Sequence, residues 1–183
     1  ASQNTSRALI GSICRNITGQ KEVVDGGVRI HWMTARFYNL SRVQDSLDTK
    51  DQLVSVDALS GRGAFIPLKV FREIGLYDEK HLPQYAADYE FSVRAKKKGY
   101  DLLVNYQAPV FSCVEETGLN NRLRKLTWAE FWQSFYSIKS PNNLQYRWNF
   151  ARLTCPWYKF IFFYPLDTLR VIFGSFKRQF QGA

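Results

Sequence analysis

Two carboxylates near the middle of the chain offer the clearest chemistry in this sequence. Asp88 and Glu90 stand in the first turn of a helix that the sequence predicts over residues 87–98, ended by Gly99. Because residues two apart on a helix point to different sides, one carboxylate can face a cleft while Glu90 pairs with Arg94. A carboxylate within hydrogen-bonding reach of a hydroxyl can remove its proton. The spacing therefore leaves Asp88 as the carboxylate that could act on a ligand in a cleft.

A short loop, Gly61-Arg62-Gly63, precedes this helix and is the second feature that indicates a ligand site. Glycine allows the backbone to approach a ligand closely, and the loop holds one fixed positive charge. Arg62 could contact a ligand through this charge, and Tyr85, just ahead of the helix, could stack on one through its ring.

Each of these residues also has a structural interpretation. Asp88 can accept hydrogen bonds from the free N–H groups of its own helix start. Glu90 can be fully used by the i,i+4 ion pair with Arg94. Arg62 can be a solvated loop charge, and Tyr85 can simply pack. Without further context the sequence leaves both interpretations open for each residue.

The elements that position these residues alternate between strands and helices, which predicts an α/β domain. The first helix should lie between Pro67 and Gly75, because proline favours a helix start and glycine the position after its end. Its buried face should hold Leu68, Phe71 and Ile74. Short apolar runs predict strands, and a polar stretch predicts a loop; the strands are expected at 8–17, 28–32, 53–58, 63–66, 102–104 and 110–114, and the loop at 35–52.

The order and spacing of these motifs resemble those of family 2 glycosyltransferases with the GT-A fold. That family carries a glycine-containing loop and a helix that ends in Gly-Phe/Leu-Phe/Tyr-Asp-Glu. A Glu-Asp motif at a helix start, an Arg and a Gly-Tyr then follow. The matching positions here are residues 61–63, residues 75–79, Ala87-Asp88, Arg94 and Gly99-Tyr100.

The resemblance covers about residues 8–115 and implies the acceptor-side half of an inverting glycosyltransferase. Such an enzyme transfers a sugar from a nucleotide-sugar donor to a hydroxyl of a glycan or lipid-linked acceptor, with Asp88 as the base. It implies Mg²⁺ or Mn²⁺ as cofactor. The expected fold is α/β, a partial GT-A sandwich followed by a helical tail. The substrate-binding residues would be Gly61, Arg62, Gly63, Tyr85, Glu90 and Arg94.

The sequence departs from the family pattern at three places. Ala87 replaces the Glu before Asp88, and the metal-binding His after the last strand is missing from residues 110–116. Glu115 or Glu116 could supply an oxygen ligand there instead. No Asp-x-Asp metal motif is present, so we expect it, with the nucleotide-binding half, ahead of Ala1, and we expect no turnover by this chain alone. The departures also leave a non-catalytic, glycan-binding or scaffold remnant as the alternative function.

Charge divides the chain into two parts. Residues 1–118, the expected acceptor-side domain, carry 15 basic and 14 acidic side chains, whereas residues 119–183 carry 10 basic and 2 acidic ones and 17 of the 29 aromatic residues. Thr127-Trp128-Ala129-Glu130 is a capping box, Ser140-Pro141 should start a second helix, and Pro165 should interrupt a third over 157–178.

A basic, aromatic tail of this kind has three interpretations: a membrane-surface helix, a cap on the body, or a nucleic-acid-binding segment. Aromatic and basic residues together are typical of helices that lie on an anionic membrane surface. The same aromatic side chains could instead pack on the body as an amphipathic cap. We expect no nucleic-acid partner, because no known nucleic-acid motif is present. With a lipid-linked acceptor, the protein would lie in the cytoplasm, peripheral to the inner face of the membrane.

The three cysteines, Cys14, Cys113 and Cys155, are widely spaced and form no CxxC or Cys/His cluster. We therefore expect three buried free thiols in a reducing compartment and no zinc site.

Overall fold

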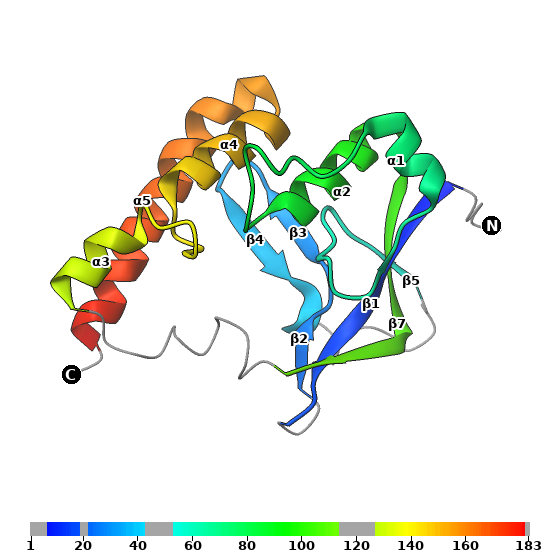
Figure 1. Ribbon diagram of the computed structural model, residues 1–183, viewed down its shortest axis with the longest axis horizontal. Coiled ribbons are helices and arrows are strands. Elements are labelled where there is room, and N and C mark those ends of the chain that lie inside the picture. The colour runs from blue at the N-terminus through cyan, green and yellow to red at the C-terminus, as the bar shows by residue number, and fades with distance from the viewer. Residues whose placement is uncertain (1–6, 19–21, 43–52, 114–126, 182–183) are drawn as a thin grey trace.

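The computed structural model describes residues 7–18, 22–42, 53–113 and 127–181. These residues form a mixed α/β protein: a curved sheet carries two helices on one side, and a group of helices from the end of the chain lies beside a short hairpin (Figure 1). The α/β class predicted from the sequence is confirmed.

The main sheet is built around two long parallel strands, β1 and β7, paired along most of their length. Its path runs β2-β1-β7-β5, and β6 adds an antiparallel pair to β1. The strands are β1 (Ala8–Asn16), β2 (Val23–Asp25), β5 (Leu53–Ser55), β6 (Ala64–Phe65) and β7 (Asp101–Ser112). Because β6 pairs with β1, the Gly-Arg-Gly loop just before β6 is drawn against the centre of the sheet.

Two details of the predicted strands were wrong. Residues 102–104 and 110–114 do not form separate strands: β7 is continuous to Ser112, and its ladder to β1 is interrupted between the pairs Ser12–Asn105 and Cys14–Val110. Pro109 lies in that interruption, where its missing N–H costs no ladder bond. The expected loop at 35–52 contains β4 (Arg36–Asn39), followed by a short 3-10 helix, η2 (Leu40–Arg42). Residues 43–52 lie outside the described residues.

Two helices cover one face of the sheet. Helix α1 (Leu68–Ile74) begins after Pro67 and ends at Gly75, whose φ of 80° suits glycine, as predicted. Its buried face differs from the prediction in one residue, because Val70 is fully buried while Leu68 is 73% exposed. Helix α2 (Ala87–Lys97) follows and packs Phe91 against Phe71 of α1.

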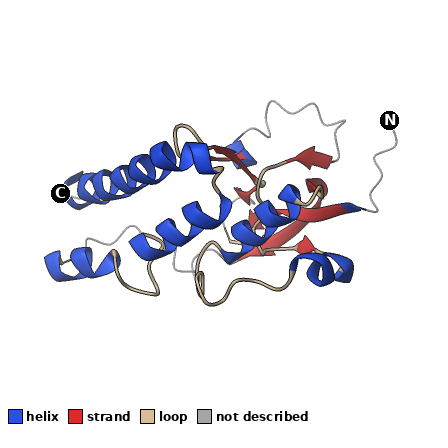
Figure 2. Cartoon of the chain, turned by 90° about the horizontal axis from the view of Figure 1, so that it is seen from above, coloured by secondary structure: helices blue, strands red, loops and turns tan. Residues whose placement is uncertain are grey.

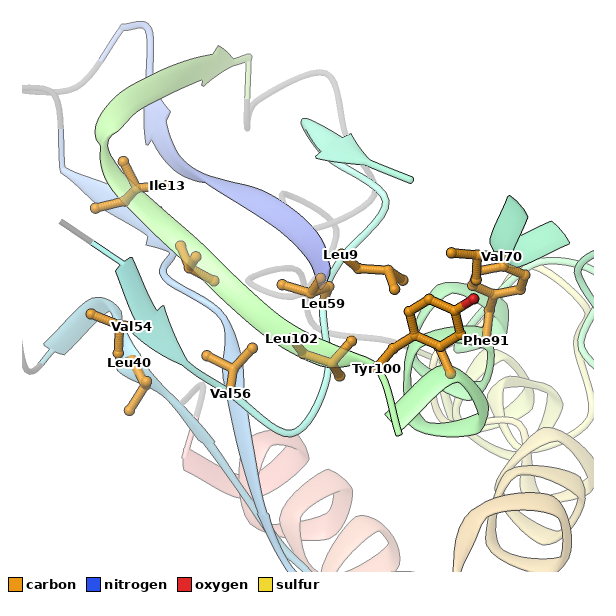
Figure 3. Packing of buried hydrophobic residues seen from close by; sticks show 12 residues of the cluster. Leu9, Ile13, Leu40, Val54, Val56, Leu59, Val70, Phe91, Tyr100 and Leu102 are labelled. Carbon is orange, nitrogen blue, oxygen red and sulfur yellow. The ribbon is translucent and has the colours of Figure 1, made fainter. Parts of the chain in front are cut away.

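The first hydrophobic core lies between the sheet and these helices (Figure 3). Its side chains come from β1, β5, β7, α1 and α2, so strands far apart in sequence share one core with the helix that carries Asp88. Its fully buried members include Leu9, Ile13, Val56, Val70, Phe91, Leu102 and Val104. This packing fixes α2 relative to β1.

The end of the chain is helical, as predicted: α3 (Trp128–Ser134), α4 (Leu144–Thr154) and α5 (Trp157–Gln181). The capping box is present, with the Thr127 hydroxyl accepting from the Glu130 N–H at 3.2 Å. Helix α4 starts later than expected, because the Asn143 side chain caps it rather than Ser140. Pro165 does not interrupt α5, which continues through it.

The tail shares a second core with the body. A hairpin of β3 (Val28–His31) and β4 brings Trp32 and Phe37 against Phe150 of α4 and Phe163 of α5. Arg147 of α4 pairs with Asp167 of α5 at 2.6 Å, so the two helices are joined by charge as well. Figure 2 shows the tail helices extending away from the sheet. Among the described residues, no helix combines the length and apolar character needed to cross a bilayer.

Candidate functional site

The Gly-Arg-Gly loop and the start of α2 meet at Asp88. The Gly61 N–H donates to Oδ2 of Asp88 at 2.8 Å, across 27 residues of sequence, and the Tyr89 N–H donates to Oδ1 at 2.9 Å. A carboxylate oxygen can accept two hydrogen bonds, and one is described for each, so both oxygens can still accept from another donor. The side chain that the sequence singled out is therefore held rigidly against the loop expected to bind substrate, and its backbone contacts leave it able to accept a proton.

The turn ahead of Asp88 has an unusual backbone. Ala86, the residue that caps α2, has φ of 66° and ψ of 5°, a left-handed conformation that costs an L-residue about 1–2 kcal/mol. The Glu90 N–H donates to the Ala86 carbonyl at 2.8 Å and closes the first helical turn. Strain of this kind gathers at functional sites, where the surrounding structure holds it. Here it sets the direction in which α2 starts, and with it the position of Asp88.

Burial raises the pKa of Asp88 above its ordinary value of 3.8, against the lowering effect of hydrogen bonds from the N–H groups of Gly61, Tyr89 and Asp88 itself. The negative charge of Asp25 raises the pKa of Asp88 further. A higher pKa makes the ionised carboxylate a stronger base, which is what removal of a hydroxyl proton requires. The pKa of Tyr77 is raised chiefly by burial and, to a lesser degree, by the negative charge of Asp88.

Arg62 turns toward the sheet rather than standing alone in solvent. Its side chain is half-buried and lies close enough to Cys14 of β1 that its charge and a hydrogen bond lower the pKa of that thiol, although burial raises it overall. Asp25, at the end of β2, acts on the same thiol through its charge. Asp25, Arg62 and Cys14 therefore form one polar cluster that mixes both signs of charge, and the charge of Asp25 also acts on Asp88.

Asp25 is the member of this cluster that the sequence did not reveal. It is 9% exposed, and its Oδ1 accepts from the Gly27 N–H at 2.8 Å. Its position in an Asp-Gly-Gly turn signals that hydrogen bond. The action of its charge on Asp88, by contrast, depends on the folded chain, in which β2 pairs with β1 and α2 packs on the same sheet.

Gly63 fixes the loop to the sheet. Its φ is 68°, and a Cβ there would stand 2.9 Å from Val110 Cγ1 and 3.1 Å from Ser12 Cβ. The Ser12 N–H donates to the Gly63 carbonyl at 3.1 Å. Gly61 is different, since a Cβ there would make ordinary contacts of 3.8 Å with Asp88. The second glycine of the loop is thus required by the fold, and the first leaves room at the carboxylate.

Glu90 and Arg94 form the ion pair that their spacing predicted. Arg94 Nε lies 2.8 Å from Glu90 Oε1 and Nη2 lies 3.0 Å from Oε2, and Glu90 is 3% exposed. Arg94 also donates to the carbonyls of Ile74 and Leu76, the latter at 2.9 Å. The two side chains thus clamp α2 to the end of α1, which is the structural interpretation that the sequence left open for Glu90.

Tyr85 is likewise engaged by the fold. Its hydroxyl donates to the Lys139 carbonyl at 3.1 Å, and its ring packs against the second core. The structure therefore brings Asp88, Gly61, Arg62 and Gly63 together and uses Tyr85 to join the body to the segment before α4.

Within the described ranges, no three His, Cys, Asp or Glu side chains gather closely enough to hold a metal ion. The weak candidates Glu115 and Glu116 lie outside those ranges. His81 pairs with Asp78 at 2.8 Å and His31 with the Thr34 hydroxyl at 2.8 Å.

The cysteines are free, with Cys14 and Cys155 buried and Cys113 half-buried rather than buried as expected. Burial raises the pKa of Cys155 to about 11, despite the opposing charges of Lys97 and Lys159. A thiol in such surroundings stays protonated and inert at neutral pH.

Comparison with known protein families finds no family model that matches this chain. Comparison with curated proteins finds no match either.

Proposed function

We propose that this chain is the acceptor-side part of an inverting family 2 glycosyltransferase with the GT-A fold. The reaction would move a sugar from a nucleotide-sugar donor to a hydroxyl of a glycan or lipid-linked acceptor. Since the donor is a nucleotide sugar, we place the reaction in the cytoplasm, peripheral to the inner face of the membrane.

One observation carries this proposal: Asp88 is half-buried, is held by the Gly61 N–H at 2.8 Å, and has a pKa raised by burial. A merely structural carboxylate at a helix start does not need a contact with a loop 27 residues away. Together with the order of motifs from residues 61–63 to Gly99-Tyr100, this geometry favours the general-base role over the structural one.

In the proposed step, the acceptor hydroxyl gives its proton to a free lone pair of the Asp88 carboxylate. The acceptor oxygen attacks the anomeric carbon and forms the new C–O bond. The bond from that carbon to the diphosphate oxygen breaks, and the electron pair leaves with the diphosphate. A single displacement inverts the anomeric centre and needs only one base. Arg62, next to Gly61 in the same loop, would supply positive charge to the acceptor or the diphosphate.

A non-catalytic glycan-binding or scaffold protein is the alternative, favoured by Ala87 in place of the family's Glu and by the missing His in residues 110–116. In that case the loop and α2 would bind a glycan without transfer.

The whole gene product, including any segment before Ala1, provides the test. It is assayed for sugar transfer from several nucleotide sugars, alongside Asp88→Asn and Asp78→Asn as a control carboxylate. We expect Asp88→Asn to lower kcat at least about 100-fold, while Asp78→Asn retains activity. Equal transfer by Asp88→Asn and wild type would refute the base assignment, and glycan binding without transfer in the wild type would favour the alternative.

A further inference from the structure

One side of α5 is apolar and uncovered. Its exposed large side chains are at least 41% accessible, and we call them the α5 outer face: Tyr158, Ile161, Phe162, Leu166, Leu169, Phe173 and Phe180. The opposite side of the same helix is packed, with Phe163 and Asp167 buried against the body. Helix α5 therefore packs one side on the body and exposes a second apolar side that no described residue covers.

The α5 outer face continues onto α3 and ends in tryptophans. Trp128, 52% exposed, lies 6.0 Å from Phe180 between ring centroids, and Trp132, 56% exposed, lies 6.2 Å from Phe176. At the start of α5, Trp157 is 85% exposed. Tryptophan prefers the boundary between hydrocarbon and water, since its ring is apolar and its N–H is polar.

Basic residues follow one border of this face. Lys159, Arg170 and Lys177 are separated by close to whole numbers of helical turns, so they lie along one line of α5. Lys177 is exposed and Lys159 is half-buried, whereas the Arg170 guanidinium donates to the Ala35 carbonyl and so joins α5 to the body. The single acidic residue of the helix, Asp167, is 5% exposed and paired with Arg147. The charge that accompanies the apolar face is thus entirely positive.

We infer that the α5 outer face lies flat in the surface of an anionic lipid bilayer. The apolar side chains enter the boundary between headgroups and acyl chains, while the basic border meets lipid phosphates. This inference goes beyond the proposed reaction and does not depend on it. If both hold, membrane binding selects a lipid-linked acceptor over a soluble glycan.

The charge pattern distinguishes this partner from two others. A second copy of the chain, docked face to face, would bring the basic border of one helix near that of the other with no acid on the face to offset it. A nucleic acid would meet the basic residues but would leave the Ile and Leu side chains without apolar contacts.

Vesicle co-sedimentation of the full chain tests the inference. The vesicles contain phosphatidylcholine alone or with phosphatidylglycerol. Phe162→Ala/Phe173→Ala removes two exposed rings and keeps a good helix former, and Lys159→Gln/Lys177→Gln removes two charges of the border. The matched controls are Leu68→Ala, an apolar residue on α1 that is more exposed than either phenylalanine, and Lys98→Gln, an exposed lysine after α2.

We expect the wild type to bind anionic vesicles, with weak binding to neutral ones. The double Phe variant should bind roughly 100-fold more weakly and the double Lys variant about 30-fold more weakly, while both controls bind like the wild type. Urea unfolding of each variant checks that the fold is retained.

Three results would overturn the inference. The first is no binding of the folded wild type to either vesicle. The second is a dimer in analytical ultracentrifugation that the double Phe variant dissociates, since the face would then join two copies. The third is tight binding of an RNA or DNA oligonucleotide that the double Lys variant abolishes, with no binding to vesicles.

Discussion

Replacing Arg94 by Met isolates the clamp between α1 and α2. The substitution keeps an apolar stem of similar length but removes the guanidinium, so Glu90, whose side chain is 4% exposed, keeps its charge without a partner. The carbonyls of Ile74 and Leu76 lose a donor as well. Breaking one side of a buried ion pair costs about 3–5 kcal/mol, so we expect a loss of about this size in the free energy of unfolding.

Urea unfolding followed by circular dichroism measures this loss. With a slope of about 2 kcal/mol/M, the midpoint should fall by about 1.5–2.5 M. The control is Glu90→Leu/Arg94→Met, which removes both charges and should regain most of the stability. A loss below about 1 kcal/mol in Arg94→Met would match a solvated ion pair. That result would refute the clamp and leave Arg94 free to bind a substrate.

Three further predictions concern other parts of the site and the core. In thermal melts, Gly63→Ala should destabilise the fold by about 2–4 kcal/mol, because Gly63 has a positive φ and a Cβ there would make close contacts. Gly174→Ala, in α5 with open space around it, should instead stabilise the fold by about 0.5–1 kcal/mol. Equal effects of the two substitutions would contradict this reasoning. Ellman's reagent should label only Cys113 rapidly, with two more thiols after denaturation; three fast thiols would contradict burial. Because the folded state raises the pKa of Asp88, the wild type should lose stability relative to Asp88→Asn as pH rises above 3.8; a gain would mean that the sign is wrong.

The sequence predicted the local features of the site well. Pro67, Gly75 and Gly99 mark helix ends through backbone preferences that act within a few residues, and the helix that carries Asp88 lies within one residue of its predicted range. The Glu90–Arg94 pair also follows from spacing alone. Such features depend on neighbours in the chain, which a single sequence displays.

Contacts between distant segments could not be predicted in the same way. The positions of Arg62 beside Cys14 and of Asp25 near Asp88 depend on how β2 and β6 pair with β1. Strand β4 was missed because most of its side chains are exposed, so it lacks the apolar alternation that reveals a strand. Leu68 was predicted to lie on the buried face of α1, but in this seven-residue helix Val70 is the buried residue.

The most direct test of the central claim is an NMR titration of the Asp88 carboxyl carbon in the folded chain. We predict a midpoint above 3.8, together with a shift of the Gly61 amide proton that follows the same midpoint, because that N–H donates to the carboxylate. A midpoint at or below 3.8, or a Gly61 amide that does not respond, would contradict a buried base held against the Gly-Arg-Gly loop.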